Sequence, residues 1–295
     1  MNVSPEQPWT IGRLLDWTAN FLAQKGSESP RLDAEVLLAD VLKCERISLY
    51  TRYDEEAGDD ARQRYKDLIR RRIEGCPVAY LVGRKEFFSL KFEVNPSVLI
   101  PRPDTECVVI ECLRLAKSMS EPRIVDVGTG SGAIAIGLAK QHKGARITAT
   151  DKSPEALAVA QRNAEKHDLS NRIRFVQGDL LTPFHAEEQF DLIVSNPPYI
   201  PHDEIAQLPA GVRDYEPHVA LDGGADGFAV FDRLIEQARD HLTPAGWLIL
   251  EIGSPQEAEA RRRLVARVYD VGKTILDGSG HPRVLAARWH PPTRD

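Results

Sequence analysis

The chain is 295 residues long; 42% of its residues are hydrophobic, 28% are charged, and its formal net charge is −6. This composition is typical of a soluble globular protein with room for two ordinary domains, and it excludes a fibrous protein. No apolar run approaches the roughly 20 residues that a membrane helix needs. The N-terminus, MNVSPEQPWT, lacks the basic segment and apolar core of a secretory signal, so we expect a cytoplasmic protein.

Metal binding and broad nucleic-acid binding are both disfavoured by the composition. The four cysteines have no C-x-x-C spacing and the eight histidines form no H-E-x-x-H pattern, so we predict no metal site. The acidic balance argues against binding nucleic acid through its phosphates, which requires Lys and Arg to displace counterions. A basic strip at 62–72, RQRYKDLIRRR, is interpreted as a solvated helix face, with docking of an RNA-rich partner as the alternative.

The first quarter of the chain has helical periodicity. A first helix is predicted to begin after Thr10 as its N-cap and to end at Gly26. A second follows Ser29-Pro30, a capping residue with proline in the first turn, and a third spans about 59–74. Amphipathic helices joined by short loops predict a bundle of about four helices over residues 1–82.

Strand patterns begin at Gly83. Alternating apolar residues predict a β-hairpin linker over residues 83–103. Residues 104–295 then alternate between the two patterns, which predicts an α/β domain with a mostly parallel sheet and ligands at the carboxyl ends of its strands. The expected strands are 123–127, 146–151, 172–177, 190–195 and 247–252, the expected helices are 104–117, 132–142, 153–167 and 228–242, and a closing hairpin is expected near 269–276 and 284–289.

A glycine loop follows the first of these strands. It reads DVGTGSG from Asp126 to Gly132 and leads directly into a helix. Glycines allow a tight turn and let a ligand approach without a Cβ in the way. Packing of helix on strand is the alternative, but three glycines at alternate positions favour a bound small molecule. Gly128, Gly130 and Ala133 also satisfy the loose G-x-G-x-x-G/A fingerprint, so the loop leaves NAD and S-adenosylmethionine both open.

Two acidic residues follow the next strands. Asp151 closes the second strand, where a carboxylate can accept hydrogen bonds from both ribose hydroxyls of either cofactor. Asp179, after the third strand, stands where a side chain can meet the adenine amino group, although acidic residues are also common in exposed turns. The two residues indicate a nucleoside without deciding which.

The fourth strand ends in Asn196-Pro197-Pro198-Tyr199, at the edge of the sheet where a substrate should meet the cofactor. Prolines fix φ and lack N–H donors, so the carbonyls of this turn are left for a ligand. The side-chain carbonyl of Asn196 and the backbone carbonyl of Pro197 then offer two acceptors for the two N–H bonds of one amino group, and Tyr199 can stack on a flat π-system. An ordinary turn is the alternative.

This pair of acceptors suits a planar amide or amine nitrogen, which is a poor nucleophile because its lone pair is delocalised. Holding both hydrogens aims the nitrogen at a methyl donor and favours the pyramidal transition state. Positioning alone supplies much of the rate. We therefore predict an S-adenosylmethionine-dependent N-methyltransferase that needs no dedicated general base.

These motifs resemble the release-factor glutamine methyltransferases, the HemK/PrmC-like family, which methylate N5 of the glutamine in a Gly-Gly-Gln motif of peptide chain release factors. The resemblance covers nearly the whole chain and includes IPRPDTE at 100–106, RDYEP at 213–217, Ala220-Leu221 and Gly223-Gly224. The related ribosomal-protein glutamine methyltransferases have a different sequence after IPR and are the lesser alternative.

The resemblance implies a Rossmann-like class I methyltransferase domain with a mostly parallel seven-stranded sheet over 104–295. The residues it implies for S-adenosylmethionine are Gly128, Thr129, Gly130, Ser131, Gly132, Asp151, Asp179, Leu180 and Asn196. Asn196, Pro197, Pro198 and Tyr199 would hold the substrate glutamine, with Asn196, Pro197 and Tyr199 catalytic. Some family members carry an aromatic residue where Leu180 stands, so apolar packing is expected there instead of stacking. The helical bundle would dock the release factor, on a protein expected to be monomeric, with ribosome association left open.

Two other functions remain as alternatives. An adenine-N6 methyltransferase acting on DNA or RNA could grip a flipped base with the same asparagine, prolines and aromatic residue, but it needs a basic cleft. A non-catalytic dinucleotide-binding regulator could use the glycine loop as a sensor, but it leaves the turn at 196–199 unexplained.

Overall fold

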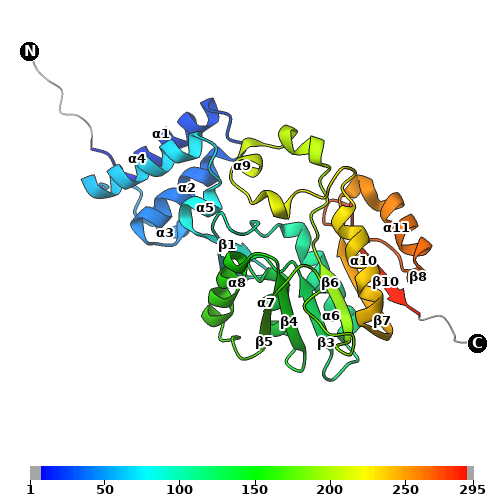
Figure 1. Ribbon diagram of the computed structural model, residues 1–295. Coiled ribbons are helices and arrows are strands. Elements are labelled where there is room, and N and C mark those ends of the chain that lie inside the picture. Colours follow the sequence, from blue (N-terminus) through cyan, green and yellow to red (C-terminus); the bar gives the residue numbers. More distant parts are fainter. Residues whose placement is uncertain (1–7, 291–295) are drawn as a thin grey trace, which may run out of the picture. The chain divides into compact units, whose positions relative to one another are not determined.

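The computed structural model describes residues 8–290, and their helices and strands form two compact units (Figure 1). The first unit consists of the described residues up to Gly83 together with Ala210–Tyr215. The second consists of Arg84–Pro209 and the described residues from Glu216 onward. The predicted hairpin therefore groups with the second unit, and a segment from far along the chain joins the first.

Helices make up the first unit. They are α1 (Ile11–Gln24), α2 (Pro30–Leu42), α3 (Arg46–Thr51), α4 (Asp59–Ile73), α5 (Val78–Val82) and α9 (Ala210–Arg213). The sequence predicted about four helices, because α3 and α5 are too short to show a clear helical period.

Capping sets the ends of the first two helices. The hydroxyl Oγ1 of Thr10 accepts a hydrogen bond from the Arg13 amide at 3.2 Å, which confirms the predicted N-cap of α1. Gly26 follows the last residues of α1 with a φ of 84°, as expected of a residue that ends a helix. Ser29 precedes α2 as predicted, but its side chain accepts no capping hydrogen bond from the described residues.

Buried polar contacts tie the helices of the first unit together. Tyr65 of α4 is almost completely buried, and its hydroxyl donates to the Ala34 carbonyl of α2 at 3.0 Å. Arg72 of α4 donates to the Asp33 carboxylate of α2 at 2.9 Å. The segment that contains α9 is attached by the hydroxyl of Tyr215, which donates to the Glu74 carbonyl at 3.1 Å.

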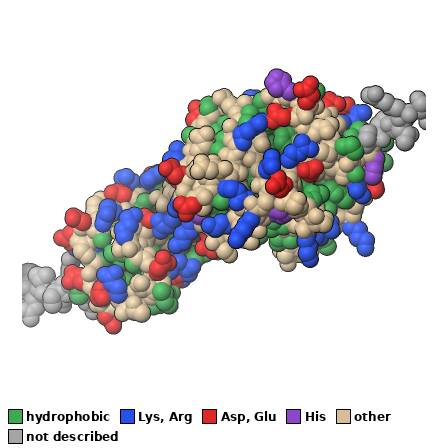
Figure 2. All heavy atoms as spheres, turned by 90° about the horizontal axis from the view of Figure 1, so that it is seen from below, with side chains coloured by type: hydrophobic (Ala, Val, Ile, Leu, Met, Phe, Trp, Pro, Cys, Tyr) green, Lys and Arg blue, Asp and Glu red, His purple; other side chains and the backbone are tan. Residues whose placement is uncertain are grey.

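Three of the six basic side chains in the strip of α4 pair with acidic side chains. Arg62 pairs with Asp59, Arg70 with Asp67, and Arg72 with Asp33. On the face drawn in Figure 2, Lys and Arg side chains lie among Asp and Glu side chains. The three ion pairs agree with the interpretation of residues 62–72 as a solvated helix face.

The second unit is built on one large sheet. Its strands are β3 (Arg123–Val127), β4 (Arg146–Asp151), β5 (Ile173–Gln177), β6 (Phe190–Ser195), β7 (Leu242–Glu251), β8 (Tyr269–Val271), β9 (Ile275–Leu276) and β10 (Pro282–Trp289). The order β5-β4-β3-β6-β7-β10-β8 has seven strands, and β9 adds to β10. The first five are parallel, while β10 is antiparallel to its neighbours. The predicted seven-stranded, mostly parallel sheet is confirmed.

Helices cover both faces of this sheet. They are α6 (Glu106–Ala116), α7 (Ala133–Gln141), α8 (Pro154–Lys166), α10 (Ala229–His241) and α11 (Glu257–Ala266). Along β3, Ile124 packs in the core formed with α6 and α7, whereas Val125 packs in the core formed with α10 and α11. This alternation buries both faces, so the accessible backbone of the parallel strands lies at their ends.

The remaining elements connect to the edge of the sheet. A hairpin of β1 (Arg84–Phe87) and β2 (Leu90–Glu93) leads to the 3-10 helix η1 (Pro103–Thr105). The 3-10 helices η2 (His202–Gln207), η3 (His218–Ala220) and η4 (Ser254–Gln256) follow β6 and β7. The sequence predicted neither these turns nor α11, because only Ala260 and Leu264 of α11 are buried and its polar sequence hides the period.

The part of the chain that the structure describes contains neither a membrane-spanning helix nor a cluster of metal-ligand side chains. No helix there is long and apolar enough to cross a bilayer. No group of three His, Cys, Asp or Glu side chains there is arranged to hold a metal ion. The absence of a metal from the working protein stays a prediction.

Candidate active site at the carboxyl ends of the parallel strands

A cavity opens where the parallel strands end, and most of the predicted site residues line it. Those that do are Gly128, Thr129, Gly130, Ser131, Asp151, Asp179, Leu180, Asn196, Pro197 and Pro198. Gly132 lies behind this surface as the N-cap of α7, with a φ of 82° and with Ile136 and Ala160 packed against it. Tyr199 is also absent from the lining. The structure thus brings ten of the twelve predicted residues to one cavity.

The glycine loop contributes shape to the cavity. Gly128 and Gly130 have φ values of 73° and 55°, in the left-handed region that favours glycine, and a Cβ added at either would meet no described atom within 4 Å. The loop amides are already used: those of Gly128 and Thr129 donate to the Thr150 carbonyl at 2.8 and 2.9 Å. The loop is therefore held from behind by β4 while its glycines leave room in front.

A buried carboxylate supports the loop from below. Asp126 accepts hydrogen bonds from the Thr129 hydroxyl at 2.6 Å and from the Ala135 amide at 3.1 Å. Its burial raises the pKa of this carboxyl to about 7, and its Oδ1 atom has no partner among the described residues. Sequence reasoning gave Asp126 no role, although a carboxylate at the end of a buried strand was a usable signal.

The two predicted acidic residues sit in different surroundings. Asp151 is held by the amides of Gly130 and Ser153, at 2.8 and 2.9 Å, and its burial raises its pKa. The Lys152 amide also bonds this carboxylate, which has about four lone-pair sites and so can still accept from a ligand. Asp179 accepts a hydrogen bond from Arg233 at 2.6 Å, and Arg233 lines the same cavity. Arg233 lies on α10, far away in the sequence, so the sequence pattern could not reveal it.

Leu180 has an unusual backbone conformation for a bulky residue. Its φ is 58°, in the left-handed region, which costs about 1–2 kcal/mol for a side chain with a Cβ. The amide of Leu181 is fixed by the side chain of Gln237 at 3.0 Å. Strain of this kind is found where a side chain must face a ligand. Here the left-handed backbone places the apolar Leu180 in the wall of the cavity.

The turn after β6 presents two free acceptors. The Ser195 hydroxyl donates to the Val127 carbonyl at 2.7 Å, which ties β6 to β3 just before the turn. Asn196 donates through Nδ2 to the Thr105 hydroxyl at 3.3 Å. Its Oδ1 and the Pro197 carbonyl accept no hydrogen bond from any described residue. These are the two acceptors that the sequence predicted, and both residues line the cavity.

The back of this turn is fixed by two loops. The Tyr199 carbonyl accepts a hydrogen bond from Gln256 Nε2 at 2.8 Å, and Gln256 Oε1 accepts one from the Gly253 amide at 3.1 Å. A Cβ at Gly227, whose φ is 79°, would lie 2.4 Å from that same carbonyl oxygen. The close approach therefore requires glycine at 227, and none of these contacts was visible in the sequence.

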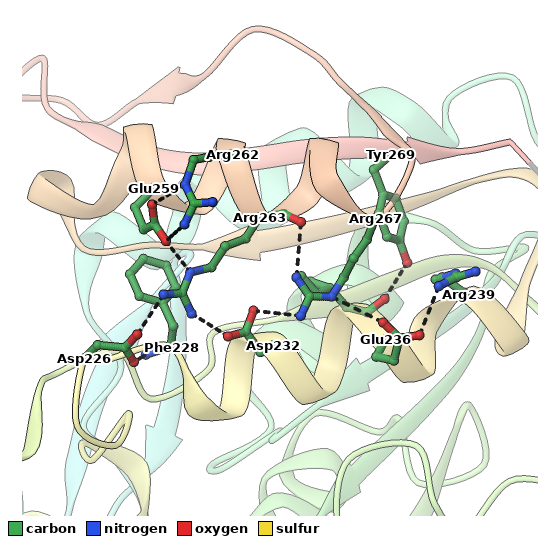
Figure 3. Close-up of polar contacts among 11 residues, drawn as sticks. Asp226, Phe228, Asp232, Glu236, Arg239, Glu259, Arg262, Arg263, Arg267 and Tyr269 are labelled. Atoms are coloured by element: carbon green, nitrogen blue, oxygen red, sulfur yellow. Dashed lines mark hydrogen bonds and ion pairs between the residues drawn. The ribbon is translucent and has the colours of Figure 1, made fainter.

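Arg263 anchors the loop that contains Gly227 (Figure 3). Its guanidinium pairs with Asp226 at 2.7 Å, with Glu259 at 2.6 Å and also with Asp232. It also packs 4.2 Å from the centre of the Phe228 ring. The arginine is largely enclosed and joins α11, α10 and the loop before α10 in one network.

We expect Arg263→Ala to lower the free energy of unfolding by roughly 2 kcal/mol or more, because three carboxylates lose a partly buried partner. Urea denaturation would measure the change. The matched control is Arg262→Ala on the same helix, since Arg262 is 69% exposed and pairs only with Glu259 among the described residues. Exposed pairs contribute little, so the control should unfold almost like wild type. Equal losses in the two variants would contradict the anchoring role.

Two of the motifs that carry the family resemblance meet beside the cavity. Glu216 of RDYEP is buried, with 3% of its surface exposed. It accepts hydrogen bonds from the Arg102 guanidinium at 2.5 Å and from the Ile100 amide at 3.2 Å, both in IPRPDTE. Arg102 and Pro217 line the cavity. The two segments therefore build one wall of the site together.

The sheet order, the glycine loop and the free acceptors after β6 define the chain as a methyltransferase of class I. The chain shares this fold with the solved methyltransferase from Pyrococcus furiosus, with a TM-score of 0.50, 24% identity, and coverage of 69% of this chain and 91% of that one. The hMettl16 catalytic domain, solved in complex with the MAT2A 3′UTR hairpin 6, matches with a TM-score of 0.56, 19% identity, and coverage of 77% and 84%. These likenesses concern the fold alone.

Sequence comparison identifies the family. The model for the PrmC N-terminal domain matches residues 13–83, and the model for the methyltransferase small domain matches residues 107–208. The release factor glutamine methyltransferase of Moorella thermoacetica is 47% identical, with coverage of 94% of this chain and 98% of that one. That of Rhodopirellula baltica is 43% identical, with coverage of 96% of this chain and 97% of that one. That of Bacillus subtilis is 39% identical, with coverage of 95% of this chain and 98% of that one. The chain belongs to the release factor glutamine methyltransferase family.

Proposed function

We propose that this protein transfers a methyl group from S-adenosylmethionine to N5 of the glutamine in the Gly-Gly-Gln motif of peptide chain release factors. The observation that carries the proposal is the pair of unused acceptors, Asn196 Oδ1 and the Pro197 carbonyl, beside the glycine-loop cavity. Family membership along nearly the whole chain supports the same substrate class.

The cavity residues suit S-adenosylmethionine, which when bound supplies a methyl group on a positively charged sulfur. Gly128 and Gly130 leave open space where side chains would stand. We assign Asp151 to the ribose hydroxyls, because its carboxylate has about four lone-pair sites and accepts from the three backbone amides of Gly130, Lys152 and Ser153. We assign Leu180 to apolar packing on the adenine and Asp179 to the adenine amino group. The Asp179 carboxylate would accept a hydrogen bond from this amino group in addition to the one that it accepts from Arg233.

The turn after β6 would orient the substrate amide. Asn196 and Pro197 accept its two N–H bonds and so direct the nitrogen lone pair toward the methyl donor. Pro198 keeps the turn rigid because its φ is fixed and it has no N–H to pair elsewhere. We also assign Tyr199 to packing against the flat amide, although it is not among the residues that line the cavity.

A groove on the first unit offers a surface for the release factor. Trp17 and Ile73, which are 49% and 40% exposed, line it together with Phe21, Tyr65 and Ile69, and with Arg62, Lys66 and Arg70. Exposed aromatic residues mixed with basic ones are typical of protein interfaces. We therefore propose that the release factor docks in this groove. We also propose that the enzyme is a monomer and acts in the cytoplasm, where translation terminates.

Methyl transfer tested on separate substrates would decide the function. Tritiated S-adenosylmethionine would be offered with purified release factor, ribosomal protein, duplex DNA or RNA. We expect label only in the release factor, and mass spectrometry should place it on the glutamine of the Gly-Gly-Gln motif. Label in DNA or RNA would support the adenine-N6 alternative instead. Binding of NAD without binding of S-adenosylmethionine in calorimetry would support the regulator.

A further inference from the structure

A buried carboxylate lies next to the substrate-holding turn without touching the cavity. Glu251 ends β7 and is 1% exposed. In the sheet, Ser195 of β6 pairs with Leu250 of β7, so the next residues, Asn196 and Glu251, leave neighbouring strands at the same edge. Thr105, the last residue of η1 and 5% exposed, contacts both side chains.

The three side chains form a directed hydrogen-bond chain. Asn196 Nδ2 donates to Thr105 Oγ1 at 3.3 Å, and the Thr105 side chain lies close enough to Glu251 for a hydrogen bond that lowers the pKa of this carboxyl. An ionised carboxylate can only accept, so the single hydroxyl proton of Thr105 goes to Glu251. The hydroxyl oxygen then has only lone pairs for Asn196, which must offer its NH₂ group. The carbonyl Oδ1 is left for the cavity.

We propose that Glu251 is a positioning residue that acts through Thr105 to hold the Asn196 amide with Oδ1 facing the substrate nitrogen. The two ends of an asparagine amide have nearly the same size, so only hydrogen-bond partners decide which end faces the cavity. A reversed amide would place N–H donors against the N–H bonds of the substrate. The inference rests on the proposed function of Asn196. It gives a role to Thr105, the threonine of IPRPDTE, which lies between Asn196 and Glu251.

The ionisation of Glu251 makes the arrangement sensitive to pH. Burial raises the pKa of this carboxyl to about 7, although the hydrogen bond from Thr105 and the charge of Arg283 act in the opposite direction. The charged and titratable groups that face it are Arg102 and Asp104 before α6, Cys107 in α6, Tyr199 after β6 and Arg283 in β10. Its Oε2 atom has no partner among the described residues.

The direction of the pH effect follows from the hydrogen-bond chain. Below pH 7 Glu251 becomes protonated and can donate to Thr105, which frees the hydroxyl proton to bond Asn196 Oδ1 instead. The productive form is the ionised one, and it becomes populated as the pH rises through the pKa. Turnover at saturating S-adenosylmethionine should therefore rise with pH through about 7.

The variant Glu251→Gln tests the positioning role. Glutamine can donate to Thr105 at any pH, so we expect the rate constant kcat to fall roughly tenfold, as when one substrate hydrogen bond is weakened. The pH dependence through 7 should disappear, while the Kd for S-adenosylmethionine stays within about twofold. A pH dependence caused by Asp126, which lies beneath the glycine loop, would instead appear in the Kd for S-adenosylmethionine. The two measurements therefore distinguish the effect of Asp126 from that of Glu251.

A pair of substitutions at Thr105 supplies the control. Thr105→Val removes the hydroxyl at nearly constant volume and should lower kcat as Glu251→Gln does, whereas Thr105→Ser keeps the hydroxyl and should restore most of the activity. The double variant T105V/E251Q should be no slower than either single variant, because both break one chain. In the valine variant the pKa of Glu251, followed by ¹³C NMR of its carboxyl carbon, should rise, since the hydroxyl no longer stabilises the ionised form.

Three results would overturn the inference: a Glu251→Gln enzyme within twofold of wild type at all pH values, equal kcat values for the valine and serine variants, or fully additive losses in the double variant. If Glu251→Gln fails to fold, the Thr105 pair and the NMR titration decide. A wild-type enzyme that transfers no methyl group to a release factor would instead refute the proposed function, which is a separate outcome of the same assay.

Discussion

Replacing Asn196 with alanine should lower kcat by roughly 10² to 10³ while leaving the fold nearly intact. Among the described residues its side chain hydrogen-bonds only Thr105, at 3.3 Å, so little native structure depends on it. What alanine removes is Oδ1, one of the two acceptors that would hold the substrate amide. Loss of one preorganised contact of this kind acts mainly on the transition state, so kcat should fall more than substrate binding weakens.

Single-turnover methyl transfer to a purified release factor at saturating S-adenosylmethionine would measure this effect. Asn163→Ala is the matched contrast, because that asparagine is fully buried and bonds Glu93 and Ser131. Its loss should appear first as lower stability in urea denaturation, by about 1–3 kcal/mol, and only secondarily in kcat. Turnover of Asn196→Ala within threefold of wild type would contradict the role assigned to it.

The sheet and the cavity could be predicted because their signals are local in the sequence. Parallel strands buried on both faces have nearly continuous apolar sequences, as in LIV at 192–194 and in IVDV at 124–127, which one Asp interrupts. Their carboxyl ends meet at one edge, so residues that directly follow strands could be placed together without coordinates. The glycine loop, Asp151 and Asn196 were all found in this way.

Contacts between distant segments could not be predicted. Thr105, Asn196 and Glu251 come from three separate parts of the chain, and only the register of β6 on β7 brings the last two together. The same holds for Arg233, whose bond to Asp179 depends on where α10 packs. The prediction for Tyr199 did not anticipate that its backbone carbonyl would be fixed by Gln256, or that the residue would be absent from the cavity lining.

Gly130→Val should abolish binding of S-adenosylmethionine. Gly130 has a φ of 55° and lines the cavity, and a Cβ there meets no described atom within 4 Å, so the added methyl groups would project into the space proposed for the ligand. Because no described protein atom lies within 4 Å of that Cβ, we expect the loss to come from exclusion of the ligand. The left-handed backbone adds a cost of about 1–2 kcal/mol in stability for any residue with a Cβ.

Gly26→Val separates these two effects. Gly26 has a φ of 84° and equally open surroundings, but it follows α1 in the first unit and lines no part of the cavity. Both variants should lose similar stability in thermal melts, while only Gly130→Val should lose the heat of S-adenosylmethionine binding in calorimetry. Retained binding by Gly130→Val would mean that the cofactor lies elsewhere. A similar loss of binding in Gly26→Val would mean that the change acts through global stability, because no ligand contact could then account for it.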